Sequence, residues 1–354
     1  MRDYKQELSK LLAIMIDKGA SDVHLTAGRY PIIRINDNLL ALTDKYQLNR
    51  EDMLGFARAM IPEAYFESFL STKELDFSFE YNNILRFRGN AFFQKGSVGL
   101  TLRAITSNIK TLKELNLPKI LETFIRKKQG FFLVVGPVGQ GKSTTLAAMV
   151  DQINHERTEH IMTIEDPIEY LFVEDKSIIN QREVRVDTES FHIALRSLFR
   201  QDIDVVMIGE MRGPQTISVA VTAAETGHLV FSTLHTNNAA QTISRIIDSF
   251  PAVQQGQIRL QLADSLLGIF SQRLIPRISG GRIPAYELLI NNNAVSTLIR
   301  EGRTHEIDIV IETSSEQGMI SLDKSLASLV RAGEITPNDA YTYTSNLQNL
   351  ERFL

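Results

Sequence analysis

The sequence predicts a mixed α/β protein, in which a small α+β domain precedes a larger domain built on a parallel sheet. Two changes in pattern along the chain predict this fold class. Before about residue 105, short alternating runs typical of strands follow one amphipathic helix. After about residue 119, continuous apolar runs rich in Val and Ile alternate with helical stretches, as in parallel sheets covered by helices on both faces.

The same patterns divide the chain into segments. We expect a small domain over residues 1–107, a polar linker over 108–118 that ends at Pro118, and the core of a second domain over 119–275. Residues 276–354 are predicted to be mostly helical. Within this last part, Thr336-Pro337-Asn338-Asp339 predicts a helix start, with Thr as the cap and Asp three residues later.

The first domain opens with apolar residues at helical spacing, and Gly19 is the expected end of that helix. Alternating runs then predict a sheet. The helix positions are Leu8, Leu11, Leu12, Met15 and Ile16, and the strand runs are DVHLT (22–26), PIIRI (31–35), LDFSFEY (75–81), FRGNAFF (87–93) and VGLTLRAI (98–105).

The second domain contains four apolar runs: FFLVV (131–135), HIMTI (160–164), DVVMI (204–208) and HLVFSTL (228–234). Helical stretches over 190–199 and 214–227 lie between them. Ligands of parallel sheets collect at the carboxyl ends of the strands. Polar motifs follow all four runs, so we expect the functional site at this edge.

Composition excludes several classes of function. The chain has no cysteine, which rules out disulfides, thiolate zinc sites and cysteine nucleophiles. The 38 Lys and Arg against 42 Asp and Glu give a formal charge of −4, which argues against a protein that coats nucleic acid. The amino-terminal residues lack a signal-peptide pattern, and no window resembles a transmembrane segment. We therefore expect a cytoplasmic protein.

The segment GPVGQGKSTT (136–145) fits the phosphate-binding pattern G-x-x-x-x-G-K-[ST]. Its backbone amides and the following helix N-terminus would hold the phosphates of ATP. Lys142 would reach the β and γ phosphates, and the Ser143 hydroxyl would bind Mg²⁺. The predicted ATP-binding residues are Gly136, Pro137, Val138, Gly139, Gln140, Gly141, Lys142, Ser143 and Thr144.

Acidic residues follow two of the other strands. Glu210, two residues past Ile208, is expected to orient the attacking water or act as a general base. The segment TIEDPIEY (163–170) places Glu165 and Asp166 after a neighbouring strand, as a site that orients water or, through Glu165, binds Mg²⁺.

His228 and His235 stand at the two ends of the last strand. Residues seven apart in a strand face opposite sides, which argues against a metal pair. His235, at the carboxyl end, is expected to sense the γ phosphate. A P-loop site also commonly needs an arginine to balance charge, and the first domain offers Arg86, Arg88 and Arg103.

Taken together, the glycine loop, TIEDPIEY, GEMR and GHLVFSTLHTN resemble the secretion and type IV pilus traffic ATPases. The resemblance extends over nearly the whole chain. Segments 19–35, 87–105, 179–184, 234–251 and 293–302 are similar to the pilus-retraction branch of this family.

This resemblance implies a PAS-like first domain, a RecA-like second domain and a homohexamer that holds ATP between the two domains. It implies that Glu165 and Asp166 form an acidic box, that His228 and His235 form a histidine box, and that Arg88 and Arg103 contact phosphates. It further implies a motor for pilus retraction at the periphery of the inner membrane, acting on a membrane platform protein.

The chain departs from the family pattern at two places of interest. Gly213 replaces the acid that closes the motif after Arg212, which removes a carboxylate beside that arginine. The carboxy-terminal motif reads AVSTLIRE over 294–301, with three changed interior positions. Three alternatives remain: a pilus-extension or secretion motor, a weakly active accessory paralogue and, in a different class of function, a nucleic-acid motor. The absence of cysteine disfavours an extension or secretion motor, because those motors often carry a four-cysteine zinc element. The acidic charge balance disfavours a nucleic-acid motor.

Overall fold

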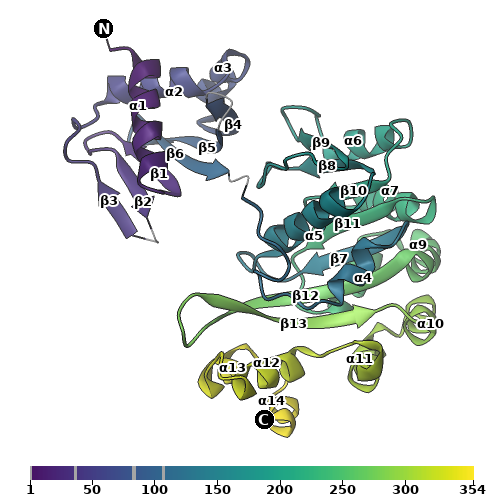
Figure 1. The fold of residues 1–354 in the computed structure, drawn as a ribbon. Coiled ribbons are helices and arrows are strands. Elements are labelled where there is room, and N and C mark those ends of the chain that lie inside the picture. Colours follow the sequence, from purple (N-terminus) through teal and green to yellow (C-terminus); the bar gives the residue numbers. More distant parts are fainter. Residues whose placement is uncertain (1, 36–37, 82–84, 106–107) are drawn as a thin grey trace. The chain divides into compact units, whose positions relative to one another are not determined.

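The computed structural model describes residues 2–35, 38–81, 85–105 and 108–354. The chain forms two compact units, Met1–Ser107 and Asn108–Leu354. The first contains an antiparallel sheet and the second a largely parallel one, which confirms the predicted mixed α/β class (Figure 1).

The N-terminal unit is a six-stranded antiparallel sheet in the order β3-β2-β1-β6-β5-β4. Residues of one face, such as Val23, Leu102 and Phe87, are buried against helices α1, α2 and α3. Its elements are α1 (Tyr4–Asp17), β1 (Asp22–Thr26), β2 (Ile32–Ile35), β3 (Asn38–Ala41), α2 (Arg50–Met60), α3 (Glu63–Thr72), β4 (Glu74–Tyr81), β5 (Leu85–Gln94) and β6 (Ser97–Ile105).

The C-terminal unit has a seven-stranded sheet in the order β13-β12-β7-β11-β10-β8-β9, parallel except for β13. Alternate residues of β7 enter two separate cores. Phe131, Leu133 and Val135 pack with helices α6–α11, and Phe132 and Val134 pack with α4 and α5. The sheet is therefore covered by helices on both faces, and its carboxyl edge remains available for a ligand.

The order along this unit follows the chain. Its elements are α4 (Leu121–Ile125), β7 (Gly130–Val135), α5 (Lys142–Glu156), β8 (His160–Glu165), β9 (Ile178–Glu183), α6 (Phe191–Leu198), β10 (Val205–Ile208), α7 (Pro214–Glu225), β11 (Leu229–Leu234), α8 (Ala239–Asp248), α9 (Ala252–Ser265), β12 (Leu266–Pro276), β13 (Arg282–Ile290), α10 (Asn293–Glu301), the 3₁₀ turn η1 (Thr304–Glu306), α11 (Ile307–Thr313), the 3₁₀ turn η2 (Ser315–Gln317), α12 (Leu322–Arg331), α13 (Pro337–Tyr343) and α14 (Leu347–Phe353).

The carboxy-terminal part is mostly helical, as expected, but it begins with a strand that the sequence analysis did not predict. Strand β13 pairs with β12 across a turn at Gly280 and Gly281, both with positive φ, and adds an antiparallel edge strand to the sheet. Helices α12–α14 pack with the far end of this hairpin (Figure 1). Further along, Thr336 and Asp339 form the expected capping box at the start of α13.

The stretch expected to be a linker is packed into the C-terminal unit. Leu112 and Leu117 are buried in the same core as α4 and α5. Residues 108–118 therefore belong structurally to the second unit, because two leucines spaced along a polar stretch are enough to anchor it.

Candidate active site

The glycine loop joins β7 to α5 in the middle of the parallel sheet. Gly136, Gly139 and Gly141 have φ values of 148°, 77° and 79°, a region that favours glycine. At Gly136 a Cβ atom would lie 2.6 Å from the backbone oxygen of Gln272, so a side chain does not fit there. Helix α5 begins at Lys142, directly after this loop. The loop thus joins a buried strand to a helix N-terminus, the arrangement that the motif predicts, and its binding of phosphate stays a prediction.

Strand β12 supports the loop from behind. The Gln272 Nε2 donates to the backbone oxygen of Gln140 at 2.5 Å, and the Thr145 hydroxyl donates to Gln272 Oε1 at 2.7 Å. In return, the backbone N–H of Leu274 donates to Gln140 Oε1 at 2.6 Å. Sequence reasoning missed Gln272, since nothing near residue 272 indicates which strand would lie beside the loop.

A chain of polar contacts links three strand ends. The Lys142 Nζ donates to the carbonyl oxygen of Pro137 at 2.8 Å and lies 3.2 Å from His235 Nδ1. On the other side of the ring, His235 Nε2 faces Glu210 Oε2 at 3.5 Å. Because an ammonium group only donates, Nδ1 is the acceptor in this contact, and Nε2 is the ring nitrogen that faces Glu210. His235 therefore bridges the predicted phosphate-binding lysine and the predicted catalytic acid.

Lys142 is buried in this arrangement, with 7% of its surface exposed. Burial lowers the pKa of its ammonium group, and the nearby Glu169 and Glu210 oppose that effect. The charge is held close to the loop, where a phosphate would compensate it.

Glu210 and Asp166 share a cationic partner that the sequence did not assign. Arg212 forms a close ion pair with Glu210, and its Nη1 lies 3.8 Å from Asp166 Oδ2. Arg212 is therefore paired although Gly213 replaces the acid expected beside it. Gly213 has a φ of 106°, which an aspartate would adopt only with strain, so the backbone here suits the departure.

Glu165 ends β8 and is buried, with 5% of its surface exposed. Burial raises the pKa of its carboxyl group to about 7, against the opposing effect of three hydrogen bonds. The donors are the Thr163 hydroxyl at 2.7 Å, the Glu169 backbone N–H at 3.2 Å and the Gln181 side-chain amide at 3.4 Å. Glu165 is fixed by this network, whereas Asp166 next to it lies at the charged edge of the site.

Two further predicted residues lie at the start of α5. Ser143 is its second residue, and the Thr144 hydroxyl shares a hydrogen bond of 2.8 Å with the Tyr170 hydroxyl. Among the described residues, no cluster of three or more His, Asp or Glu side chains could hold a metal ion alone. The Ser143 hydroxyl at the start of α5 nevertheless suits Mg²⁺, which usually keeps water and substrate phosphates as ligands.

The structure does not bring His228 to these residues. It precedes β11, and the six residues of that strand separate it from His235 by roughly 20 Å. Its Nδ1 lies 3.0 Å from the carbonyl oxygen of Ala223, and its ring packs edge-on against Phe199. These contacts are those of a packed histidine, and its catalytic role stays a prediction.

The two predicted arginines lie in the N-terminal unit. Arg88 of β5 and Arg103 of β6 are directly paired across the strands, so both side chains project from the sheet face opposite the helices. The Arg103 Nε donates to Asp22 Oδ1 at 2.8 Å, and Arg88 is exposed. Their contact with phosphates stays a prediction.

The fold and site define the class of the protein, which is a P-loop nucleotide-binding protein. At the carboxyl ends of its parallel strands, Lys142, His235 and Glu210 lie in one series of contacts. Comparisons with known proteins specify the family. A family model described as Type II/IV secretion system protein matches residues 93–334. The chain belongs to this family, which confirms the resemblance seen in its motifs.

Several relatives cover almost the whole chain. The Type IV pilus retractation ATPase PilT of Pseudomonas aeruginosa is 42% identical over 94% of this chain and 97% of its own length. The Type IV pilus ATPase PilU of the same species is also 42% identical, over 97% of this chain and 90% of its own. The crystal structure of the pilus retraction motor PilT with bound ADP is 45% identical, with a TM-score of 0.91 over 97% of this chain and 98% of that one.

No helix in the described part of the chain combines the length and apolar character needed to cross a membrane.

Proposed function

We propose that this chain is an ATPase motor that drives type IV pilus retraction. ATP hydrolysis changes the conformation of each subunit, and a homohexamer transmits the change to a platform protein of the inner membrane. The chain acts from the cytoplasmic side of that membrane. The similarity to the retraction motor over nearly the full length supports this function.

The observation that carries the proposal is the contact series from Lys142 through His235 to Glu210. Lys142 binds phosphate oxygens with the same Nζ that now donates to Pro137 and His235. A phosphate that binds there competes for these hydrogen bonds, so His235 is placed to respond to nucleotide and to move Glu210 with it. His235 thereby links the presence of the γ phosphate to the position of the acid.

Glu210 orients the attacking water and accepts its proton. Since Arg212 pairs with Glu210 in this structure, a productive state requires that carboxylate to turn from the arginine towards the nucleotide. Ser143, with Glu165 as a further ligand, would hold Mg²⁺, which neutralises the charge of the phosphates. Arg88 and Arg103 contribute further positive charge to the phosphates in the assembled ring.

A second candidate function is that of an accessory pilus ATPase. The relative named Type IV pilus ATPase PilU has the same identity to this chain as the retraction ATPase, so identity does not separate the two. Secretion motors are less favoured, because the Type II secretion system protein E of Pseudomonas aeruginosa matches only 44% of this chain.

Glu210→Gln tests the proposed chemistry. The substitution keeps the size of the side chain but removes its basicity, so ATP binding should persist while kcat falls by about 100-fold or more. Binding and steady-state hydrolysis by the purified chain measure the two effects. Glu225→Gln, at an exposed position of α7, is the matched control. Unchanged turnover in Glu210→Gln would refute the assignment of the acid.

Deletion of the gene in the source organism tests the biological role. A retraction motor predicts cells with excess pili and no twitching motility. Loss of pili would favour an extension motor. Normal twitching with a weakened pulling force would favour an accessory ATPase.

A further inference from the structure

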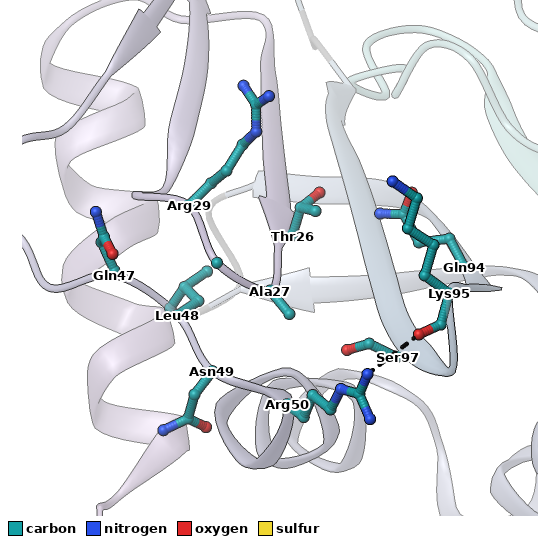
Figure 2. A pocket seen from close by; sticks show the side chains of 11 residues that line it. Thr26, Ala27, Arg29, Gln47, Leu48, Asn49, Arg50, Gln94, Lys95 and Ser97 are labelled. Atoms are coloured by element: carbon teal, nitrogen blue, oxygen red, sulfur yellow. Dashed lines mark hydrogen bonds between the residues drawn. The ribbon is translucent and has the colours of Figure 1, made fainter.

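A separate pocket in the N-terminal unit has the properties of a binding site. Its volume is about 710 Å³, and three segments form its walls: the β1–β2 turn, the residues before α2, and the β5–β6 hairpin (Figure 2). Pockets that bind small ligands are commonly about 300–1,000 Å³ in volume. None of its lining residues belongs to the candidate active site.

The charge of the pocket has one sign. Arg29, Arg50 and Lys95 line it, and no aspartate or glutamate does. Among the described residues, none of these three cations has a recorded ion pair, although Arg50 Nη2 donates weakly to the backbone oxygen of Lys95 at 3.4 Å. Three cations around one cavity repel one another, and a bound anion would relieve that repulsion.

A buried hydroxyl adds a second, independent observation. Ser97 lines the pocket with only 8% of its surface exposed, and its Oγ has no hydrogen-bond partner in the described part of the chain. Figure 2 shows this hydroxyl directed towards the interior of the pocket. An unsatisfied buried hydroxyl is unfavourable, so its retention suggests a partner that is bound only part of the time.

The segments around the pocket are held in place before any ligand binds. The backbone N–H of Gly28 donates to the carbonyl oxygen of Leu48 at 2.6 Å, and the backbone N–H of Leu48 donates to the carbonyl oxygen of Arg29 at 2.9 Å. On the opposite wall, Lys95 and Gly96 form the tight hairpin turn, with φ values of 49° and 71°. Such a preformed frame lowers the entropic cost of binding.

The N-terminus of α2 opens at the same place. Arg50 is the first residue of this 11-residue helix, and Asn49 caps it with a side-chain acceptor to the Asp52 N–H. The first turn also carries Glu51 and Asp52, so the three side chains, rather than the helix N-terminus, supply the positive charge of the pocket. All these features favour a ligand rich in acceptor oxygens.

We propose that this pocket binds an anion that carries a phosphate group. The lining offers guanidinium, ammonium, hydroxyl and amide donors, which match phosphate oxygens. It contains no aromatic side chain on which a nucleobase could stack, and Ala27 and Leu48 are its apolar residues. The phosphate group, rather than an attached base, is therefore the recognised chemistry. A free diphosphate and an anionic lipid headgroup both supply it.

Pyrophosphate titration of the full chain tests the site directly. Lys142→Ala serves as the background, because it removes the main phosphate contact of the nucleotide site. In that background the pocket should still bind pyrophosphate, as followed by calorimetry. Arg50→Gln and Lys95→Gln should each weaken binding by about tenfold. The pair Lys5→Gln and Lys18→Gln removes two exposed charges of the same unit outside the pocket lining and should leave binding unchanged.

Vesicles distinguish the source of the phosphate. If the ligand is a lipid headgroup, the chain should co-sediment with phosphatidylglycerol vesicles but not with neutral phosphatidylcholine vesicles. Arg50→Gln and Lys95→Gln should each lose this binding. Pyrophosphate binding without vesicle binding identifies a soluble anion.

Ser97→Ala separates a ligand contact from a purely structural role. It should raise the Tm of the free chain slightly and reduce the Tm increase that pyrophosphate causes, since the lost hydroxyl serves only the ligand. The proposal is overturned if neither probe binds in the Lys142→Ala background. It is equally overturned if both probes bind the pocket variants as well as they bind the control pair.

Discussion

The two polar sites of this chain differ in how their charges are compensated. At the carboxyl edge of the parallel sheet, Lys142 contacts His235, His235 faces Glu210, and Glu210 pairs with Arg212. In the pocket of the N-terminal unit, Arg29, Arg50 and Lys95 line the wall without any carboxylate. The first site is neutralised within the protein, and the second is not.

This difference indicates how each site responds to a ligand. A nucleotide at the first site has to replace contacts that already exist, so its binding changes the positions of the residues that made them. An anion at the second site meets charges and a hydroxyl with no competing acidic partner in the lining, so its binding mainly adds stability. The first arrangement suits a motor, and the second suits a binding site.

The largest expected effect comes from removing the central charge of the first site. Lys142→Ala should abolish measurable ATP binding and lower turnover on the order of 1000-fold, because it removes the buried ammonium group that contacts the loop and His235. Fluorescent-nucleotide titration and phosphate release measure both. Lys127→Ala, at an exposed position, is the control. Retention of ATP affinity by Lys142→Ala would show that the loop alone holds the nucleotide.

The next prediction concerns pH. Burial raises the pKa of Glu165 and of Glu287 to about 7, above the usual 4.5. The folded chain then binds more protons than the unfolded one between pH 4.5 and 7, so its stability falls as the pH rises through that window. Each group contributes on the order of 3 kcal/mol to this fall.

Glu287→Gln tests that dependence. Its Oε1 accepts the Ala239 backbone N–H at 2.8 Å, a bond that the amide oxygen of glutamine preserves. Urea unfolding at pH 5 and at pH 7 should show a smaller difference in the variant than in the native chain. Equal differences in the two proteins would mean that Glu287 titrates normally. Glu225→Gln, an exposed change, should retain the native difference.

A smaller effect is expected from the support behind the loop. Gln272→Ala leaves the Thr145 hydroxyl, which is 2% exposed, without its acceptor and should lower the free energy of unfolding by about 1–3 kcal/mol. The KM for ATP should rise by about tenfold, with a smaller change in kcat, because the loop loses its alignment. Steady-state kinetics and urea unfolding measure both. Gln257→Ala, at an exposed position of α9, should change neither. An unaltered KM in Gln272→Ala would refute the supporting role.

The smallest effect concerns the second site and has the opposite sign. Ser97→Ala should stabilise the free chain by up to about 1 kcal/mol, because it removes a buried hydroxyl that has no described partner. Thermal unfolding without added phosphate measures this. A lower Tm of Ser97→Ala would show that the Ser97 hydroxyl has a hydrogen-bond partner in solution. The second site, like the first, would then be compensated before a ligand binds.

Much of the first site could be predicted from the sequence because its parts are local. The residues from Gly136 to Thr144 are contiguous, and each further motif directly follows an apolar strand. Parallel strands bring their carboxyl ends together, so Glu165, Glu210 and His235 were expected at one edge, where the structure places them. His228 precedes β11, so it lies at the amino ends of the parallel strands, away from the other predicted residues.

Tertiary contacts decided the rest. Gln272 supports the loop from 132 positions away, Arg212 pairs with Glu210 rather than with a following acid, and the hairpin of β12 and β13 extends the sheet. The anionic-ligand pocket combines residues from three loops with no shared motif. The sequence by itself determined the two-part α/β fold, the family and the phosphate loop, because these depend on contiguous residues and on strand periodicity. Only folding determined which distant side chains compensate one another's charge, because that depends on strand order and register.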